Sequence, residues 1–287
     1  KKLIAPAMNT RMFENPILQD NLEKCRHYGM DIIMPDSGRL ACGDVGSGKL
    51  PSEEVLVAAI LKEIRYEKDM QGLKVLVTAG ATQEAIDPVR FISNHSTGKM
   101  GFALAKTAMQ RGADVTVVAA HTSAKEPLYV NIRRVSSAAD MFEACKEEAK
   151  TADIIIKAAA VADYTPVETA DNKIKKSDDT MAITCKRTQD ILAYLGAHKP
   201  DGQFLCGFSM ETEHMLENSE KKLEKKNLDM IVANNLKVKG AGFATDTNVV
   251  TLITKEEVKE LPLMSKDEVA NEILTQILQR RCPENGQ

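Results

Sequence analysis

Short runs of aliphatic and β-branched residues recur from Leu73 onward, and most are separated by segments with helical periodicity. The apolar runs are 74–78, 114–118, 153–156, 203–206, 229–232 and 249–253. The helical segments are 98–111, 137–150 and 213–227, followed by a C-terminal helix after a capping pattern at Ser265 and Glu268. Nearly continuous apolar strands alternating with helices indicate a mainly parallel sheet covered on both faces. The sequence therefore predicts a doubly wound α/β fold.

In doubly wound, Rossmann-like sheets, ligands bind beyond the carboxyl ends of the strands, where the strand order reverses. Candidate chemistry should therefore lie in the loops that follow the predicted strands. These loops come after Thr78, Val118, Ala160, Gly207 and Ala233.

The front of the chain follows a different pattern. A turn-rich segment, 35–48, separates two helix-like stretches, and the second begins at Pro51. The charged segment that follows ends in Gly72 and resembles a linker. We therefore expect one domain over 1–66, a linker over 67–72 and a second domain over 73–287. The opening residues already look like a strand, so the chain is expected to begin inside a domain.

Charge and cysteine usage exclude several functions. Lys plus Arg is 38 and Asp plus Glu is 41, giving a net charge of −3. Nonspecific nucleic-acid binding needs a basic surface, so this balance argues against it. The six cysteines include no CxxC pair, and the five histidines show no zinc-site spacing. No apolar run approaches the roughly 20 residues of a membrane span. We expect a cytoplasmic protein with reduced thiols.

The loop after the first strand of the second domain is rich in polar groups. Asp87, Arg90, Asn94 and Ser96 fall within ten residues and precede Gly98, which opens a helix. A glycine-rich helix N-terminus offers N–H groups to an anion. Close packing of the helix on a strand is an alternative role for the glycines. The concentration of polar side chains favours ligand binding.

Two later segments allow two interpretations each. Small residues up to Asp163 would let a ligand approach the backbone, or would pack a helix tightly on the sheet. Asp163 could hold magnesium or a sugar hydroxyl. Lys173 begins a lysine-rich stretch, and Lys222 and Lys226 share a helical face. These lysines could be ordinary solvated surface, or they could neutralise a triphosphate.

Taken in order, these motifs resemble one known family, the CTP-dependent bacterial phosphopantothenoylcysteine synthetases. The resemblance covers about 73–262, and the front segment resembles an FMN-dependent phosphopantothenoylcysteine decarboxylase. The synthetase motifs are 78–82, 86–101, 158–164, 173–176, 207–212, 222–234 and 242–248. The decarboxylase motifs are 6–9 and 38–49.

The resemblance implies a ligase that joins 4'-phosphopantothenate to L-cysteine through an acyl-cytidylate, with CTP as co-substrate and Mg²⁺ as cofactor. Lys173 would act on the triphosphate, Asn94 would hold the acyl-cytidylate, and Arg90 would belong to the same catalytic loop. Ser96 and Gly98 would bind substrate, and Asp163 is the candidate metal ligand. Nucleotide contacts would come from Ala160, Asp163, Lys173, Asp190, Phe208, Lys222 and Lys226. The resemblance further implies a homodimer formed through the synthetase domain.

For the front segment, the resemblance implies a partial flavodoxin-like domain. Asn9 would bind substrate, and Cys42 would supply the thiol or proton that reduces an enethiol intermediate. A buried structural thiol is the alternative role for Cys42. The family's catalytic histidine and most of its flavin loops have no counterpart here. FMN is therefore implied for the intact parent protein, and we do not expect this chain alone to bind FMN or decarboxylate.

Two motifs depart from the family pattern. Where the family has a Pro-Asp-Ile step near the nucleotide, this chain has Gln189, Asp190 and Ile191, and the family's Ser-Ser-Gly is Ser-Thr-Gly at 96–98, which keeps the hydroxyl. Two other classes remain as alternatives. An NAD(P)- or flavin-dependent oxidoreductase would need a GxGxxG motif after a strand, which Gly80 does not begin. A non-catalytic interaction module would use its lysines only as a solvated surface.

Overall fold

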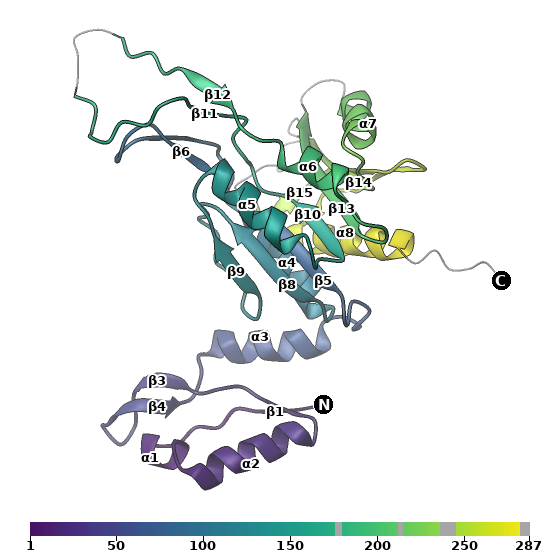
Figure 1. Cartoon of the computed structure of the whole chain (residues 1–287). Coiled ribbons are helices and arrows are strands. Elements are labelled where there is room, and N and C mark those ends of the chain that lie inside the picture. The colour runs from purple at the N-terminus through teal and green to yellow at the C-terminus, as the bar shows by residue number, and fades with distance from the viewer. Residues whose placement is uncertain (176–179, 212–214, 236–244, 282–287) are drawn as a thin grey trace, which may run out of the picture. The chain divides into compact units, whose positions relative to one another are not determined.

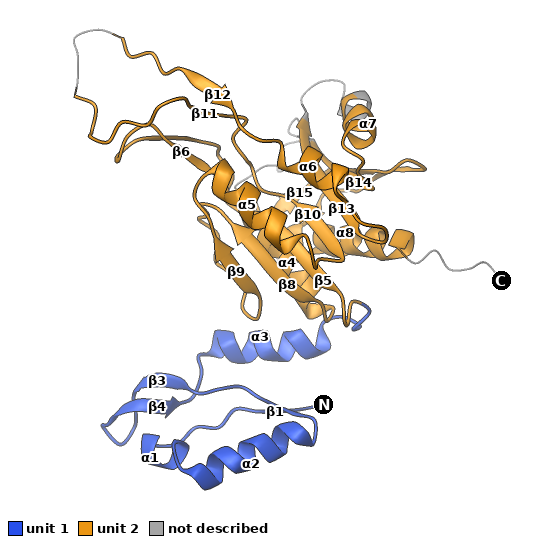
Figure 2. Cartoon of the chain, in the orientation of Figure 1, with its two compact units in different colours: residues 1–69 blue, residues 70–287 orange. Residues whose placement is uncertain are grey.

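The computed structural model of the chain describes residues 1–175, 180–211, 215–235 and 245–281. These residues divide into two units, Lys1–Asp69 and Met70–Gln287 (Figure 2). Parts of four predicted motifs or segments, at Lys176, Thr212, 213–214 and 242–244, lie outside the described residues. Met70 has no solvent exposure and belongs to the core of the second unit.

The first unit holds a short parallel strand pair and an antiparallel hairpin. Its elements are β1 (Lys2–Ile4), α1 (Thr10–Phe13), α2 (Pro16–His27), β2 (Met30–Ile32), β3 (Asp36–Arg39), β4 (Val45–Lys49) and α3 (Glu53–Ile64). β1 pairs with β2, and β3 pairs with β4. Asn15 caps α2, which has proline at its first position, and Ser52 caps α3. The Ser52 cap places the start of α3 close to Pro51, where the sequence predicts the second helix to begin.

The second unit is built on a sheet whose order is β17-β16-β14-β13-β10-β5-β8-β9 in the described part of the chain. The strands are β5 (Lys74–Ala79), β8 (Asp114–Ala119), β9 (Asn131–Arg134), β10 (Ile154–Lys157), β13 (Phe204–Glu211), β14 (Met230–Asn235), β16 (Val250–Ile253) and β17 (Val258–Glu260). The neighbouring strands β9, β8, β5, β10, β13 and β14 are parallel to one another. β16 pairs antiparallel with β14, and β17 pairs antiparallel with β16. The doubly wound, mainly parallel α/β prediction is confirmed.

Helices cover both faces of this sheet (Figure 1). On one face lie α4 (Lys99–Gln110) and α8 (Lys266–Arg281); on the other lie α5 (Ala138–Glu148), α6 (Ile191–Ala197) and α7 (Met215–Lys225). Strand residues alternate between the two cores: Ile154 and Ile156 face α4 and α8, while Ile155 faces the opposite layer. This double burial explains the continuous apolar runs.

The strand order reverses next to β5. The chain passes from β5 outward to β8 and β9, then returns to β10 on the other side of β5. The carboxyl ends of β5 and β10 are therefore the switch point at which doubly wound sheets bind ligands.

An arm extends away from the sheet (Figure 1). It consists of the described residues of 83–93 and 164–187, with the pairs β6 (Gln83–Ala85) with β7 (Phe91–Ser93) and β11 (Tyr164–Pro166) with β12 (Cys185–Arg187). The Ala170 amide donates to the Ile86 carbonyl at 3.0 Å, which joins its two halves. The arm exposes large apolar side chains at Val89, Phe91, Tyr164, Val167, Met181 and Ile183.

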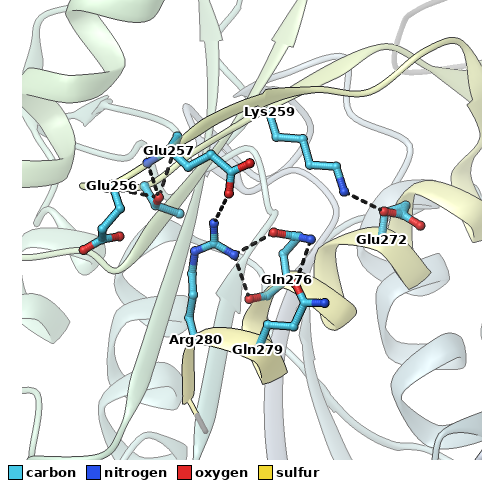
Figure 3. Close-up of polar contacts among 8 residues, drawn as sticks. Glu256, Glu257, Lys259, Glu272, Gln276, Gln279 and Arg280 are labelled. Carbon is cyan, nitrogen blue, oxygen red and sulfur yellow. Dashed lines mark hydrogen bonds and ion pairs between the residues drawn. The ribbon is translucent and has the colours of Figure 1, made fainter. Parts of the chain in front are cut away.

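The opposite edge of the sheet is fastened to α8 by polar contacts (Figure 3). Arg280 pairs with Glu257 at 2.8 Å, and Lys259 pairs with Glu272 at 3.2 Å. At the start of α8, which follows β15 (Thr247–Asn248) and β18 (Met264–Ser265), Ser265 and Glu268 form the predicted capping box. In the described part of the chain, no helix has the length and apolarity needed to cross a membrane.

Candidate active site

A cavity of about 480 Å³ lies at the switch point, where the carboxyl ends of β10, β13 and β14 meet the start of α4. Its walls also include the start of α6, the end of α7 and the first residue of α8. Most of the predicted synthetase residues line it, namely Asn94, Ser96, Gly98, Ala160, Asp163, Asp190, Phe208, Lys222 and Lys226. Residues separated by more than a hundred positions thus meet in one place.

The run of small residues after β10 lines the cavity and is held by β5 and by the loop that follows β5. Thr78 accepts a hydrogen bond from the Ala159 amide at 3.0 Å, and Thr82 accepts one from the Ala162 amide at 2.9 Å. Above this run, the Asn94 side-chain amide donates to the Ala160 carbonyl at 3.3 Å. The small residues line the cavity, and Ala158, Ala159 and Val161 also pack against the two cores; contact with a ligand stays a prediction.

The two glycines at the start of α4 have separate roles. A side chain at Gly101 would approach the Ala79 side chain to 2.7 Å, so this glycine allows α4 to pack on β5. Gly98 has a φ of +82°, lines the cavity and gives α4 no side-chain cap. The N-terminus of α4 consequently faces the cavity with its positive dipole end.

On the face covered by α5 to α7, charged side chains gather around the start of α6. Asp190 caps α6 by accepting from the Ala193 amide at 3.0 Å, and it pairs with Lys226 at 2.8 Å. Burial works to raise the pKa of Asp190, but Lys226 and the Ala193 amide outweigh it and hold that pKa below its ordinary value. Asp190 is therefore an ionised anchor for Lys226.

Lys157 lines the same region and was not predicted from the sequence. It ends the apolar run of β10 and faces the α5 layer, with Cys145 nearby. Burial lowers the pKa of Lys157, and burial raises the pKa of the Cys145 thiol to about 11. The sequence signal was a lysine in the last position of a buried strand, which is costly unless it serves a site.

Arg90 and Lys173, both predicted to be catalytic, lie on the arm and do not line this cavity. Asp87 accepts hydrogen bonds from the Arg90 side chain at 2.9 and 2.5 Å and from the Ile174 amide at 3.1 Å. Arg90 donates in turn to the Ile174 carbonyl at 2.9 Å. Arg90 thereby fixes the backbone beside Lys173, while the Lys173 side chain is exposed.

The Asp87 contacts give a pH-dependent prediction. The Arg90 guanidinium is the main cause that holds the pKa of Asp87 below its ordinary value. Backbone amides lower this pKa further, whereas burial acts to raise it. The ionised form therefore stabilises the arm at neutral pH, and this contribution decreases as the pH falls below the unfolded-state value. Asp87→Asn should speed hydrogen exchange of the Val89 and Ile174 amides roughly tenfold at pH 7.

Hydrogen-exchange NMR checks this prediction, with Asp171→Asn as the control because Asp171 is exposed on the same arm. The difference between Asp87→Asn and the wild type should narrow toward acidic pH. Unchanged exchange at neutral pH would contradict the anchoring role of Asp87.

The predicted decarboxylase residues lie in the first unit. Asn9 is exposed and caps α1 by accepting from the Met12 amide at 2.9 Å. Cys42 is an exposed free thiol between β3 and β4, with Asp44 at 3.7 Å from its sulfur. The alternative of a buried structural thiol is therefore wrong.

Fold and site together define a doubly wound α/β protein with a lysine-lined cavity at its switch point. The family comparison makes this more specific. Residues 70–280 match the family described as "DNA/pantothenate metabolism flavoprotein C-terminal domain", and residues 1–65 match the "Flavoprotein" family. The chain belongs to this family of two-part coenzyme A biosynthesis proteins.

Three similar proteins illustrate the relationship. The coenzyme A biosynthesis bifunctional protein CoaBC of Bacillus subtilis is 47% identical over 96% of this chain and 68% of its own length. A protein named cysteine/cysteine sulfinic acid decarboxylase, from an unknown prokaryotic organism, is 44% identical over 96% of this chain and 78% of its own. The solved C-terminal domain of a CoaBC protein has 47% identity and a TM-score of 0.63, covering 73% of this chain and 98% of that domain. The oxidoreductase alternative receives no support from the family or from these relatives.

Proposed function

We propose that this chain joins 4'-phosphopantothenate to L-cysteine, using CTP, in coenzyme A biosynthesis in the cytoplasm. The observation that carries the proposal is the cavity at the switch point, which gathers Asn94, Asp163 and the lysines of α7 from separate motifs. Membership of the coenzyme A biosynthesis family supports the same reaction.

The first step is activation of a carboxylate, which is a poor electrophile. The carboxylate oxygen of 4'-phosphopantothenate forms a bond to the α-phosphorus of CTP, and the bond to pyrophosphate breaks. Lys157, Lys222 and Lys226 line the nucleotide end of the cavity, where their charge would offset that of the triphosphate. Positioning and charge neutralisation are the main requirements of such a transfer.

The second step forms the amide. The amine of cysteine attacks the acyl carbon, the new C–N bond forms, CMP leaves with the bonding electrons, and the amine loses a proton. The Asn94 amide donates to the Ala160 carbonyl at 3.3 Å in the cavity wall, which supports a role for Asn94 in holding the acyl-cytidylate for this attack.

Magnesium fits this site as a partner of the nucleotide. Among the described residues, no group of three or more His, Cys, Asp or Glu side chains is placed to hold a metal ion. Mg²⁺ needs only one or two carboxylates when substrate phosphates complete its shell. Asp163, which is exposed in the cavity wall, would hold it, and Mg²⁺ would there neutralise phosphate charge.

For the first unit we propose a part in decarboxylating the product of the ligase. Asn9 would bind the substrate, and Cys42 would provide the thiol in its exposed turn. FMN supplies the redox chemistry of this reaction in the intact flavoprotein.

We further propose a homodimer formed through the arm. Its exposed apolar side chains, such as Phe91 and Tyr164, each about half exposed at 52%, would be buried against a second copy. Lys173 lies on this arm and outside the cavity of its own chain. In such a dimer, the arm of one copy would bring Lys173 to the cavity of the other copy.

The experiment that tests the function measures pyrophosphate release with 4'-phosphopantothenate and magnesium, comparing CTP with ATP and presence with absence of cysteine. We expect pyrophosphate release to require CTP. We expect added cysteine to convert the intermediate into the amide product and CMP. Carbon dioxide from cysteine alone, without nucleotide consumption, would instead support the activity named for the cysteine decarboxylase relative. No release by a folded sample would contradict the ligase proposal.

Lys157 allows a prediction that concerns only the nucleotide-binding end of the cavity. Lys157→Met should raise the KM for CTP roughly tenfold or more, because a partly buried ammonium is removed from the triphosphate region. The KM for 4'-phosphopantothenate should change little. Initial rates check both values, with Lys146→Met on the surface of α5 as the control. A normal KM for CTP would exclude this role.

A further inference from the structure

Two lysines at the end of α7, Lys222 and Lys226, line the nucleotide end of the cavity. Helix α7 extends to Lys225, so Lys226 lies at the point where the helix ends and the chain turns toward β14. The Lys226 amide still donates to the Lys222 carbonyl at 3.0 Å. The contacts that hold this helix end therefore decide where the Lys226 ammonium group lies.

The chain leaves α7 through a Schellman motif, a common way to end a helix. The Asn227 amide donates to the Glu224 carbonyl at 3.2 Å, as this motif requires. The Leu228 amide donates to the Leu223 carbonyl at 2.9 Å, and both leucines are buried in one core. Asn227 has a φ of +50°, in the left-handed region where glycine is the usual residue because it has no Cβ. The backbone alone thus favours glycine at this position.

Asparagine at this position supplies a side chain that glycine lacks. The Asn227 side-chain NH₂ group donates to the Gly196 carbonyl at 2.9 Å, and Gly196 lies in the last turn of α6. A Cβ atom at Gly196 would collide with the Lys226 carbonyl, so the backbones of the two helix ends are in contact. At the start of α6, Asp190 pairs with the Lys226 ammonium group at 2.8 Å. Helix α6 therefore holds Lys226 at both its backbone and its side chain.

We propose that Asn227 is a positioning residue for nucleotide binding. Its side chain fastens the end of α7 to α6, and this places the Lys226 ammonium group for the phosphates of CTP. A lysine side chain loses conformational freedom when it is held at a ligand, so a fixed backbone and a fixed partner, Asp190, reduce the entropy that binding must still remove. Asn227 does not line the cavity and acts only through Lys226. This role rests on the proposed ligase function, in which CTP is the co-substrate.

Asn227→Gly tests this role because it removes the side chain and keeps the left-handed turn. The Kd for CTP, measured by titration calorimetry without the acid substrate, and the KM for CTP should each rise about five- to tenfold, the effect of losing one hydrogen bond. The KM for 4'-phosphopantothenate and the midpoint of thermal unfolding should change little. The decisive measurement uses a double variant with Lys226→Met. In that background Asn227→Gly should alter the Kd for CTP by less than about twofold, because no ammonium group is left to place.

Tyr129→Gly is the matched control. Among the described residues, Tyr129 is the other non-glycine residue with a left-handed φ, at +62°, and it lies outside the cavity wall. Its replacement should leave the affinity for CTP unchanged, which shows that placing glycine at a left-handed position does not by itself affect the nucleotide site.

The possible results separate this role from the function it rests on. Wild-type protein that binds CTP but releases no pyrophosphate contradicts the ligase proposal, and the binding measurements still test Asn227. An unchanged Kd for CTP in Asn227→Gly overturns the positioning role, because the residue then serves only to end the helix. Effects of Asn227→Gly and Lys226→Met that simply add also overturn it. Equal rises in the KM for CTP and for 4'-phosphopantothenate, with a lower unfolding midpoint, overturn it as well, because they indicate a general loosening of the fold.

Discussion

Lys173→Gln is expected to lower CTP-dependent pyrophosphate release about 100- to 1000-fold, the loss typical when a charge that stabilises a transition state is removed. Negative charge builds on the leaving pyrophosphate, and glutamine keeps the length of the side chain without its positive charge. The structure makes this a demanding prediction, because Lys173 is exposed on the arm and does not line the cavity of its own chain. The effect requires the arm to deliver Lys173 to a nucleotide site.

The measurement is a single-turnover pyrophosphate assay at saturating CTP. Lys186→Gln is the control, because Lys186 is an exposed lysine of β12 on the same arm and outside the cavity wall. Loss in both variants would indicate a general effect of arm charge. Near-normal release by Lys173→Gln would show that Lys173 has no part in activation.

Most of the fold could be predicted from the sequence because its strands are buried on both faces. Such strands appear as uninterrupted apolar runs, and the run at 153–156 corresponds closely to β10. The edge strands β9 and β17 were missed. β9 contains Arg133 and Arg134, and β17 contains Lys259 and Glu260, so neither shows a continuous apolar pattern. Polar edge strands avoid pairing with other chains, which removes the signal that sequence patterns depend on.

Residues of the candidate site could be predicted where they belong to a recognisable sequence motif. Single residues that come together only in the folded chain could not. Asn94 and Asp163 lie in motifs that follow β5 and β10, and both line the cavity. Lys157, Asn234 and Asn248 also line it, but their significance depends on burial and on missing partners. Those properties exist only after distant segments pack together. For the arm the reverse holds: a sequence motif identifies Lys173 as a candidate, but the structure does not bring its side chain to the cavity of its own chain.

Asn94→Asp is expected to separate the two chemical steps. Activation should continue, giving a burst of about one pyrophosphate per site, while amide formation slows roughly 100-fold. The reason is that the Asn94 amide group, held at 3.3 Å from the Ala160 carbonyl, becomes a carboxylate with no N–H to donate. A negative charge there opposes the charge that develops on the acyl oxygen during attack by the amine. Quench-flow measurement of pyrophosphate and CMP distinguishes the steps, and equal loss of both would refute the division.

Mixing the Lys173→Gln and Asn94→Asp variants and measuring amide formation then tests where Lys173 acts. If a dimer places Lys173 of one copy at the Asn94 of the other, a mixed dimer has one site with both residues intact and one site with both replaced. Random exchange makes half of the dimers mixed, so we expect about a quarter of wild-type activity. If each site uses the lysine of its own chain, neither site in a mixed dimer has both residues and no activity returns. Because each variant alone keeps only about 1% or less of wild-type amide formation, recovery to about a quarter can only come from a site shared between two copies.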